Sequence, residues 1–560
     1  MKKKHFGLRV LLPTAVILAS LVIFTAASNQ NFKVAQNISI FNSVLKNVDL
    51  FYVDTINVDK TVGTGINAML NSLDPYTTYF PAEDDGELQQ LLKNTYGGIG
   101  SVITYNVKNK QTLIAEPYEG MPAQKAGLKA GDVLVKIDSV WLKGKTSSEV
   151  SKMLRGPSGT GFTLYIQHPD KNDTVAIPII RRNIELPTVS YYGMRKDSIG
   201  YIQLSTFTGE PAKAFRKALM SLKEKGIKGL VIDLRNNGGG LVDQAVEIAN
   251  YFIPADKVIA NTKGRDKRMN SSYKTTQQPI ALDLPVAVLV NSGSASASEI
   301  LSGAFQDLDR GVIIGTRTFG KGLVQSTRRL PYGGTLKVTT AKYYTPSGRC
   351  VQAIDYSHRN EDGSVGRIPD SLTHVFHTSA GREVRDGGGI TPDIKQEAPR
   401  MPNILYYMVR DQIFFNFATT YCQAHDSIAS PEKFEIDDAT YEAFKDSVIH
   451  AKFTYDPQSK KILEQLKEAA KFEGYAKDAA PELKALETKL THNLKKDLDI
   501  FATPIKKMLA IEIAKRYYYQ TGGIIETLKN DSILMRAENI LKDQTAYKKI
   551  LSPKMPSEKK

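Results

Sequence analysis

Two short stretches of the sequence combine residue types that could carry out acyl-transfer chemistry. Residues 291–299, NSGSASASE, hold four serines separated by small residues, and residues 315–325, GTRTFGKGLVQ, place Lys321 between two glycines. A serine hydroxyl becomes a good nucleophile only when a neighbouring base takes its proton. An amine can be that base when burial lowers its pKa towards neutrality. The two stretches therefore predict a serine nucleophile paired with a lysine.

Ser296 is the serine that two different patterns select. Ser296 and Glu299 have the S-x-x-E spacing of a capping box, which would place Ser296 at the N-cap of a helix. A serine at a sharp strand-to-helix turn is also the arrangement of a nucleophile elbow, in which the next N–H, that of Ala297, faces the developing oxyanion. The sequence leaves both interpretations open.

The stretch GLVIDLRNNGGG at 229–240 offers further N–H groups for an oxyanion. A buried-strand pattern runs into three glycines and then into a helical pattern. Glycines allow a ligand to approach the backbone closely and leave N–H groups free at a helix N-terminus. No Gly-Lys-Ser/Thr follows, so a phosphate-binding loop is excluded. A glycine-rich turn without a function would have the same pattern.

Histidine and cysteine usage argues against other kinds of site. The region of these motifs holds only His358, His374 and His377, none of them in a motif with small residues, so a Ser-His-Asp triad is disfavoured. The two cysteines, Cys350 and Cys422, make neither a disulfide framework nor a metal cluster. We therefore expect no metal and no cofactor.

The elements that must position these motifs alternate in type from about residue 181 to 395. Apolar strand patterns (IGYIQL, GLVIDLR, PVAVLVN, RGVIIGT) alternate with helical patterns (EPAKAFRKALMSLKEK, LVDQAVEIANYFI, SEILSGAFQDL). This order predicts an α/β layered core. Residues 30–92 have helical spacing, and the last 160 residues are rich in Lys and Glu with helical periodicity.

Between residues 93 and 180 the sequence predicts a small, mostly β domain. Short alternating runs (SVITYN, TLIAEPY, FTLYIQHP) are separated by Gly-rich turns. YGGIG at 96–100, followed by PAQKAGLKAGDVLVKID, resembles a PDZ domain of the bacterial protease-associated type. The N–H groups of Gly98, Ile99 and Gly100 would then receive a terminal carboxylate, and the following strand would pair with an extended peptide.

Charge and the N-terminus bear on location. The 560 residues carry a net charge of +15, but the basic residues are spread along the chain without a nucleic-acid-binding motif, so we expect no nucleic-acid partner.

A basic start, MKKKHFGLR, precedes 18 residues without charge at 10–27. This pattern predicts export to the periplasm or cell envelope, with residues 10–27 either removed or kept as an inner-membrane anchor.

The order of these motifs resembles the carboxyl-terminal processing proteases, also called tail-specific proteases. GLVIDLRNNGGG, VNSGSASASE and TFGKGLVQ follow a PDZ-like domain, and the resemblance covers roughly residues 35–395. It implies that Ser296 is the nucleophile, that Lys321 is the general base and that Gln325 orients the lysine. It also implies an oxyanion hole at the N–H groups of Ala297 and of one glycine, for which we choose Gly239.

The predicted fold class is multidomain α/β, with a crotonase-like layered protease core. The predicted parts are a signal peptide or anchor (1–28), an N-terminal helical cap (29–92), a PDZ domain (93–180), a serine protease core (181–398) and a helical C-terminal appendage without an assigned role (399–560). Arg155, in the LRGPSGT turn, is a candidate regulatory contact to the core.

The resulting functional hypothesis is an endopeptidase that cleaves proteins near their C-terminus, with substrates that end in a free apolar tail. An adaptor protein and a second copy of the chain stay open as further partners, and contact with a membrane is expected only through the N-terminal segment. Two alternatives stay open as well: a non-catalytic PDZ scaffold and a crotonase-like acyl-CoA enzyme.

Overall fold

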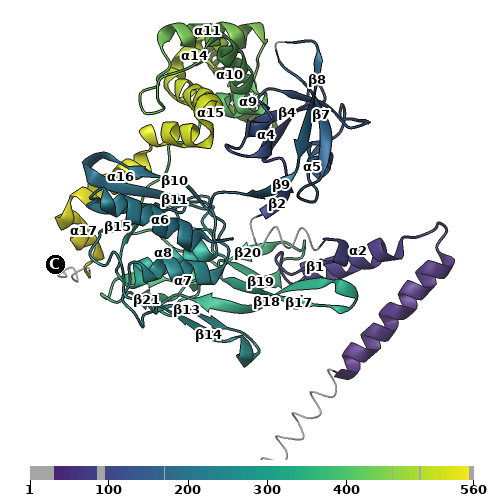
Figure 1. Cartoon of the computed structure of the whole chain (residues 1–560), viewed down its shortest axis with the longest axis vertical. Coiled ribbons are helices and arrows are strands. Elements are labelled where there is room, and N and C mark those ends of the chain that lie inside the picture. The colour runs from purple at the N-terminus through teal and green to yellow at the C-terminus, as the bar shows by residue number, and fades with distance from the viewer. Residues whose placement is uncertain (1–30, 85–94, 170, 457, 491–492, 554–560) are drawn as a thin grey trace, which may run out of the picture. The chain divides into compact units, whose positions relative to one another are not determined.

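The computed structural model describes residues 31–84, 95–169, 171–456, 458–490 and 493–553 (Figure 1). The chain divides into two compact units, residues 1–82 with 327–338 and residues 83–326 with 339–560. The segment 10–27, predicted to be a signal peptide or anchor, lies outside the described residues. Within the described ranges, no helix is both long and apolar enough to cross a membrane.

The first unit is mainly helical, as the sequence predicts for its N-terminal part. A helix covers residues 31–51, and α2 (Val58–Asn71) follows, with Asn57 as its N-cap accepting a hydrogen bond from the Lys60 N–H at 2.9 Å. The strand β1 (Thr78–Phe80) pairs antiparallel with residues 335–337.

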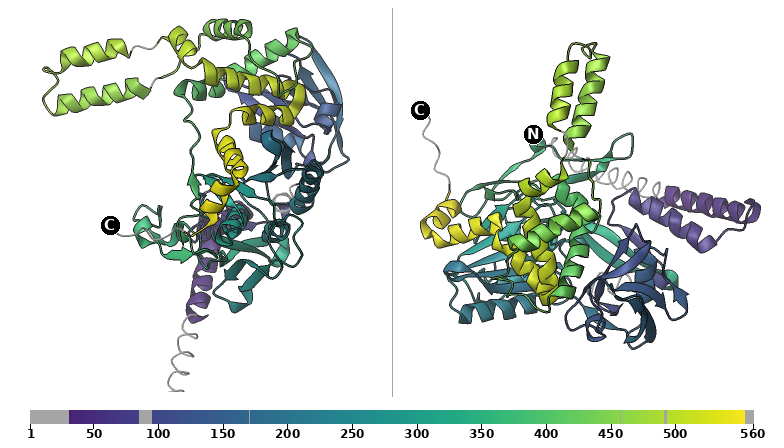
Figure 2. Two further views of the ribbon diagram at one scale, coloured as in Figure 1. Left: turned by 90° about the vertical axis from the view of Figure 1, so that its left-hand side faces the viewer. Right: turned by 90° about the horizontal axis from the view of Figure 1, so that it is seen from above.

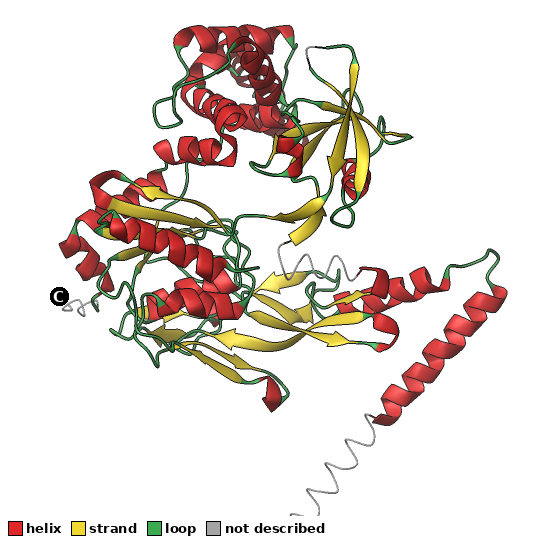
Figure 3. Ribbon diagram, in the orientation of Figure 1, coloured by secondary structure: helices red, strands yellow, loops and turns green. Residues whose placement is uncertain are grey.

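The second unit contains the predicted PDZ domain (Figure 3). Its sheet has the order β3-β4-β5-β7-β8, and β6 pairs with β5. The strands are β3 (Ser101–Asn106), β4 (Gln111–Pro117), β5 (Val133–Ile137), β6 (Val140–Trp141), β7 (Gly161–Gln167) and β8 (Thr174–Ile180). Its helices are α4 (Pro122–Lys125) and α5 (Ser147–Leu154), the latter begun by a capping box of Thr146 and Glu149. The strands β2 (Thr95–Gly98) and β9 (Arg182–Glu185), which precede and follow the sheet, pair with each other.

The motif-bearing strands form a six-stranded sheet with the order β10-β11-β12-β15-β16-β23. The strand β10 is antiparallel to β11, and the others run parallel. These strands are β10 (Val189–Met194), β11 (Ile199–Leu204), β12 (Gly229–Asp233), β15 (Val286–Val290), β16 (Val312–Gly315) and β23 (Ile394–Lys395). The helices between them are α6 (Pro211–Glu224), α7 (Val242–Asn250) and α8 (Ala297–Asp307). The predicted α/β alternation is therefore confirmed.

The two faces of this sheet are both buried, but against different helices. Alternate strand residues such as Ile232 and Val288 share one hydrophobic cluster with α6, α7 and α8. Their neighbours Val231 and Leu289 lie in a second cluster with residues of α16 (Ser532–Lys542) and α17 (Gln544–Leu551). Because side chains alternate across a strand, a strand covered on both faces is apolar throughout. Part of the predicted C-terminal appendage therefore belongs to the core of the predicted protease domain.

Most of the remaining C-terminal helices build a hydrophobic core of their own. They are α9 (Asn403–Arg410), α10 (Ile413–Ala424), α11 (Asp438–His450), α14 (Leu494–Ile500) and α15 (Ala502–Lys529), while α12 (Gln458–Phe472) and α13 (Ala480–Lys489) supply no residue to it. The cluster includes Phe414, Phe444 and Leu509, each at most 4% exposed. Figure 2 shows α12 and α13, in green to yellow-green, side by side, and an ion pair of 3.0 Å joins Lys467 to Glu487 between them.

Smaller strands complete the described chain, and the sequence did not predict their arrangement. The strand β13 (Val258–Lys263) pairs with β14 (Ser271–Lys274) and with residues 342–344 of β18 (Thr335–Tyr344), while β17 (Leu323–Arg329) also pairs with β18. Two hairpins follow, formed by β19 (Ile354–Arg359) with β20 (Val365–Arg367) and by β21 (Val375–His377) with β22 (Glu383–Arg385).

Candidate active site

The three predicted motifs lie in the loops that follow β12, β15 and β16. These strands are parallel neighbours in the sheet, so their carboxyl ends meet at one edge. Ligands of open α/β sheets bind at that edge. The sheet therefore brings the glycine run, the serine run and the Lys321 loop together, although the first and the last of them lie about 80 residues apart in the sequence.

The four serines of NSGSASASE have different surroundings. Ser294 and Ser298 are fully buried, and their hydroxyls donate to the backbone carbonyls of Leu234 at 2.7 Å and Asn237 at 2.8 Å. Ser292 is exposed, and Ser296 is half-buried. The hydroxyls of Ser294 and Ser298 therefore hold the serine loop to the glycine loop, and Ser296, between them in the sequence, is partly accessible.

Ser296 occupies the N-cap of α8 in an unusual backbone conformation, with φ 57° and ψ −115°. The Glu299 N–H donates to the backbone carbonyl of Ser296 at 2.8 Å, and the Ser296 N–H donates to the Glu299 carboxylate, as in the predicted capping box. An N-cap residue normally has extended dihedrals, whereas this region is costly for any residue with a Cβ. The strand-to-helix position and the strained backbone fit both interpretations that the sequence left open, an N-cap and a nucleophile elbow.

The buried carboxylate of Glu299 joins the serine loop to the lysine loop. Its Oε2 accepts the N–H of Ser296 at 2.9 Å and the N–H of Lys321 at 2.8 Å. Its Oε1 accepts the Thr318 hydroxyl at 2.6 Å and the Gly320 N–H at 2.8 Å. Burial raises the pKa of Glu299, while these four hydrogen bonds act in the opposite direction. The sequence predicted Glu299 only as a capping residue, because its contact with residues 318–321 depends on the tertiary fold.

The glycines on either side of Lys321 allow the loop to pack closely against residues 352–353. A Cβ on Gly320, whose φ is 88°, would lie 2.2 Å from the Ala353 Cβ, and a Cβ on Gly322 would lie 2.7 Å from the Gln352 nitrogen. Lys321 itself is half-buried. This packing explains the F-G-K-G pattern, since any larger residue would push the lysine loop away.

Gln325 lies two residues into β17, the strand that follows the lysine loop. Its side-chain N–H donates to the Thr339 hydroxyl at 3.1 Å. The backbone carbonyl of Lys321 accepts a hydrogen bond from the Tyr343 hydroxyl. Two residues of β18 therefore hold the end of the lysine loop and the start of β17.

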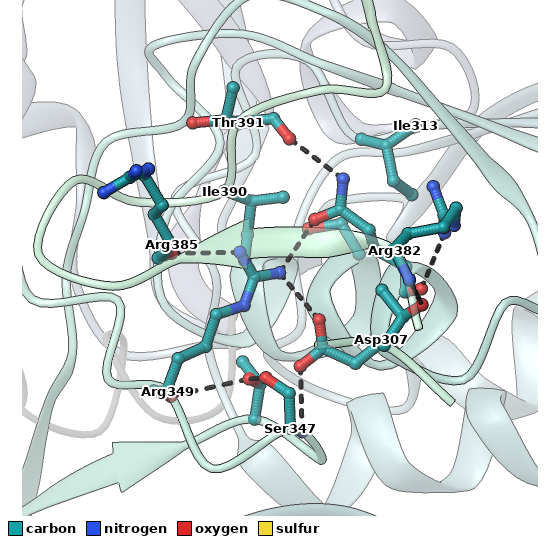
Figure 4. A network of polar contacts seen from close by, with 12 residues as sticks. Asp307, Ile313, Ser347, Arg349, Arg382, Arg385, Ile390 and Thr391 are labelled. Carbon is teal, nitrogen blue, oxygen red and sulfur yellow. Dashed lines mark hydrogen bonds and ion pairs between the residues drawn. The ribbon is translucent and has the colours of Figure 1, made fainter. Parts of the chain in front are cut away.

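The far end of α8 is anchored by a buried ionic network (Figure 4). Arg349, with 1% of its side chain exposed, contacts Asp307 at 2.7 Å, and the second oxygen of Asp307 accepts the Ser347 N–H at 3.0 Å. Arg382 binds Asp309 and Asp393 at 2.7 and 2.6 Å. These contacts fix the chain on both sides of residues 352–353, against which the lysine loop packs.

The predicted oxyanion residues lie against Ser296. A Cβ on Gly239, whose φ is 95°, would lie 2.7 Å from the Ser296 Cβ and 2.9 Å from the Ala297 nitrogen. The Ala297 N–H, at the first position of α8, donates to no acceptor among the described residues. The Gly239 N–H donates to the Asn237 side chain at 2.9 Å, whereas the exposed Gly238 N–H has no acceptor in the described part of the chain.

The PDZ turn has the features that carboxylate binding requires. The N–H groups of Ile99 and Gly100 donate to no described residue, while the carbonyls of Ile99 and Gly100 accept from Ala123 at 2.8 Å and from Tyr118 at 3.0 Å. Gly98 ends β2, and the strand β3 that follows the turn is an edge strand of its sheet. The guanidinium of Arg155 lies 4.7 Å from the centre of the Tyr96 ring, on the strand that leads into the domain.

Comparisons with known proteins now identify the family. A family model described as "Peptidase family S41" matches residues 198–357. The carboxy-terminal-processing protease of Bartonella bacilliformis is 35% identical over 342 residues, which cover 60% of this chain and 78% of that protein. The chain belongs to peptidase family S41. It is a serine-type carboxy-terminal processing peptidase with a PDZ domain, so neither the scaffold nor the acyl-CoA alternative holds.

Other matches cover the remaining parts of the S41 peptidase. A probable CtpA-like serine protease of Staphylococcus aureus is 33% identical over 349 residues, covering 62% of this chain and 68% of that protein. The solved structure of a photosystem II D1 C-terminal processing protease aligns with 27% identity and a TM-score of 0.36, covering 66% of this chain and 95% of that one. A PDZ domain model matches residues 113–167, and a model described as the C-terminal helical domain of a probable PDZ-protease matches residues 404–541.

The S41 peptidase holds no evident metal site in its described part. No group of three or more His, Cys, Asp and Glu side chains within the described ranges is placed to bind a metal ion. Both His358 and His374 pair with aspartates, at 2.6 and 3.2 Å, on the exposed hairpin region that follows residue 353.

Proposed function

We propose that this S41 peptidase cleaves its substrates with a Ser296–Lys321 dyad. One observation carries the proposal: a single oxygen of the buried Glu299 accepts the backbone N–H groups of both residues, so the two loops are held to one point. The Ser296 hydroxyl attacks the scissile carbonyl, and the Lys321 amine accepts its proton and later protonates the leaving amine. Gln325 orients the lysine.

The oxyanion formed in this step is stabilised by backbone N–H groups. Ala297 offers an N–H at a helix N-terminus, where the helix dipole adds to the hydrogen bond. In the glycine run, the Gly238 N–H donates to none of the described residues, whereas the Gly239 N–H would first have to release the Asn237 side chain. Gly239 is also required for space, because a side chain there would meet Ser296 and Ala297.

Substrates are recognised through a free apolar C-terminus in the PDZ domain. The unengaged N–H groups of Ile99 and Gly100 receive the carboxylate, and β3 pairs with the last residues of the substrate. A solved PDZ domain of a carboxy-terminal protease from Vibrio cholerae, 25% identical and aligned with a TM-score of 0.16, is described as a complex with peptide. The proposal rests on the turn and the edge strand of this chain.

The peptidase acts after export, in the periplasm or cell envelope. The basic start and the uncharged residues 10–27 support this location. Mass spectrometry of the N-terminus of membrane and soluble fractions tests it: an intact N-terminus in the membrane indicates an anchor, and a start near residue 28 in the soluble fraction indicates a cleaved signal. Full-length chain in the cytosol contradicts export.

A fluorophosphonate probe tests the dyad directly. We expect labelling of the wild-type chain and of a Ser292→Ala control, and none of Ser296→Ala, since only an activated serine reacts. Tandem mass spectrometry should place the adduct on the peptide that contains residue 296. Labelling of Ser296→Ala at the wild-type rate contradicts the assignment.

A further inference from the structure

The helix α15 (Ala502–Lys529) spans the distance between two hydrophobic cores of the second unit. Its N-terminal half supplies Ile505, Leu509 and Ile513 to the core of the C-terminal helical domain. Its C-terminal end supplies Leu528 to the cluster that covers one face of the catalytic sheet. A rigid helix in this position would hold the helical domain to the protease core.

The helix is broken between these two halves. Tyr518 has φ −122° and ψ 17°, and Tyr519 has φ 50° and ψ −150°, so neither residue is helical. The backbone of Tyr519 lies in a region that residues other than glycine rarely adopt. Gly522 and Gly523 follow within one turn. A strained break of this kind is where a long helix can bend.

The PDZ domain contacts α15 at this break. The Gln124 side chain of α4 donates to the hydroxyl of Tyr519 at 3.0 Å. The neighbour of Gln124, Ala123, donates its N–H to the carbonyl of Ile99 in the proposed carboxylate turn, at 2.8 Å. Figure 1 shows α15 beside α4 and β4. The strained tyrosine is therefore two contacts away from the turn that would bind a substrate C-terminus.

A second contact joins the PDZ sheet to α15. Arg516, with 7% of its side chain exposed, donates to the carbonyl of Ala115 in β4 at 3.0 Å, and β4 pairs with the peptide-binding edge strand β3. The Nε of Arg516 is buried without an acceptor among the described residues. A buried donor left unsatisfied raises the free energy of this arrangement.

The other end of α15 contacts the oxyanion loop. The carbonyl of Leu528 accepts from Arg195 at 3.2 Å, and Asp531, just beyond the helix, binds Arg235 at 2.7 Å. Arg235 also pairs with the fully buried Asp233 at 2.6 Å and begins the RNNGGG run. Chain contacts therefore run from the PDZ turn through α15 to the loop that carries Gly238 and Gly239.

We propose that α15 couples the PDZ domain to the oxyanion loop, with the break at Tyr518–Tyr519 as its hinge. A peptide carboxylate in the turn at 98–100 shifts α4, changes the Gln124–Tyr519 contact and alters the bend of α15, which Asp531 transmits to Arg235. This assigns a function to the C-terminal helical domain. It rests on the PDZ domain binding substrate C-termini, as proposed above.

The test separates binding from its effect on catalysis. In the full chain, hydrolysis of an internally quenched peptide amide is measured with and without acetyl-AAVALA bearing a free carboxylate, and with its C-terminal amide as the inactive ligand. Binding of a fluorescent version of the same peptide is measured by anisotropy on the Ser296→Ala background. In the wild type we expect the free acid to change kcat by about fivefold or more, a usual size for allosteric coupling.

Three variants interrupt the proposed connection, and one is a matched control. Gln124→Ala and Tyr519→Phe remove the two partners of one hydrogen bond, so the double variant should behave like either single variant. Asp531→Asn removes the charge that Arg235 binds, while asparagine can still cap α16 at Ile533 and Leu534. Tyr517→Phe is the control, because its hydroxyl contacts the His425 carbonyl within the helical domain.

We expect that the three variants still bind the peptide, but that adding the free acid changes their kcat by less than twofold. The kcat of Tyr517→Phe should change as much as that of the wild type. An unchanged response in all three variants overturns it. A wild type that binds the peptide without any change in kcat also overturns the coupling, and leaves tail recognition standing. If the Ser296→Ala chain does not bind the peptide, tail recognition itself is wrong and the coupling falls with it.

Discussion

At the scale of single residues, Ser296 has a backbone conformation that stability alone would not select. Its φ of 57° and ψ of −115° lie where a Cβ is unfavourable, and its N–H is held there by Glu299. Functional sites store strain of this kind when the surrounding contacts determine the conformation. Ser296 lies where the strand edge meets the start of α8, so the strain falls at the position that the sequence predicts for the nucleophile.

The strain predicts that two inactivating substitutions of Ser296 differ in stability. Ser296→Ala and Ser296→Gly should both lose peptidase activity by about 10⁴-fold or more. Glycine adopts a positive φ without steric cost. The free energy of unfolding of Ser296→Gly should therefore be about 1 kcal/mol larger than that of Ser296→Ala. Urea unfolding of both variants measures this difference. A less stable glycine variant would show that the serine conformation is not strained.

Lys321 should tolerate no other cation if its role is proton transfer. Lys321→Arg keeps a positive charge, but a guanidinium cannot be deprotonated at any working pH, so the variant should be about as inactive as Lys321→Ala. Gln325→Ala should lose less activity, because the role proposed for the glutamine is only to orient the amine. Steady-state kcat of the three variants tests this order, and an active arginine variant would exclude lysine as the base.

Glu299→Gln should separate the two loops without changing the size of the side chain. The carboxylate accepts two donors on each oxygen, whereas a glutamine NH₂ would face two donors and accept from neither. We expect kcat to fall by about 100-fold and the free energy of unfolding to fall by about 1–3 kcal/mol. Kinetics and chemical denaturation provide the two readouts. Full activity in this variant would mean that the shared carboxylate does not position the dyad.

At the scale of elements, α16 and α17 are part of the catalytic sheet's core, although almost 140 residues separate α16 from β23. Tyr547 of α17 is 6% exposed, and its hydroxyl accepts the N–H of Val286 at 3.1 Å at the start of β15. The strand β15 leads directly into the serine loop. Removing the C-terminal region at residue 399 would therefore uncover one face of the sheet.

Tyr547→Phe should destabilise the sheet because it leaves the buried Val286 N–H without its acceptor. The expected loss is about 1–3 kcal/mol of unfolding free energy. Tyr475→Phe is a matched control, since Tyr475 is 62% exposed and should change stability by less than about 0.5 kcal/mol. Thermal and urea unfolding compare the two. Equal stability of both variants would mean that α17 contributes little to the core.

At the scale of the whole molecule, recognition and chemistry lie on different domains. An unstructured substrate with a free apolar C-terminus should be cleaved about tenfold faster or more than the same chain ending in an amide or in Asp-Asp, if the PDZ domain recognises substrate tails as proposed. Initial rates at substrate concentrations below KM measure the preference. Equal rates for the three substrates would rule out tail recognition and leave the PDZ domain with another role.

The sequence by itself determined the local elements and the chemistry of the motifs. Several features depend only on patterns that lie within one short stretch of sequence. They are the alternation of apolar strands and helices, the PAQKAGLKAGD stretch of the PDZ domain and the selection of Ser296 and Lys321. The glycines on either side of Lys321 were also visible, although not the residues they touch.

Only the tertiary structure decided which distant groups meet. The sequence shows Glu299 only as a capping residue, whereas in the structure the sheet brings residues 318–321 to its carboxylate. Asn237 is a loop residue in the sequence, and only the structure shows that its side chain accepts the Gly239 N–H. The sequence predicts the C-terminal helices as an appendage, because amphipathic periodicity shows that one face of a helix is buried but does not show which element covers that face. Contacts between residues far apart in sequence depend on the packing of whole elements, and no local pattern contains that information.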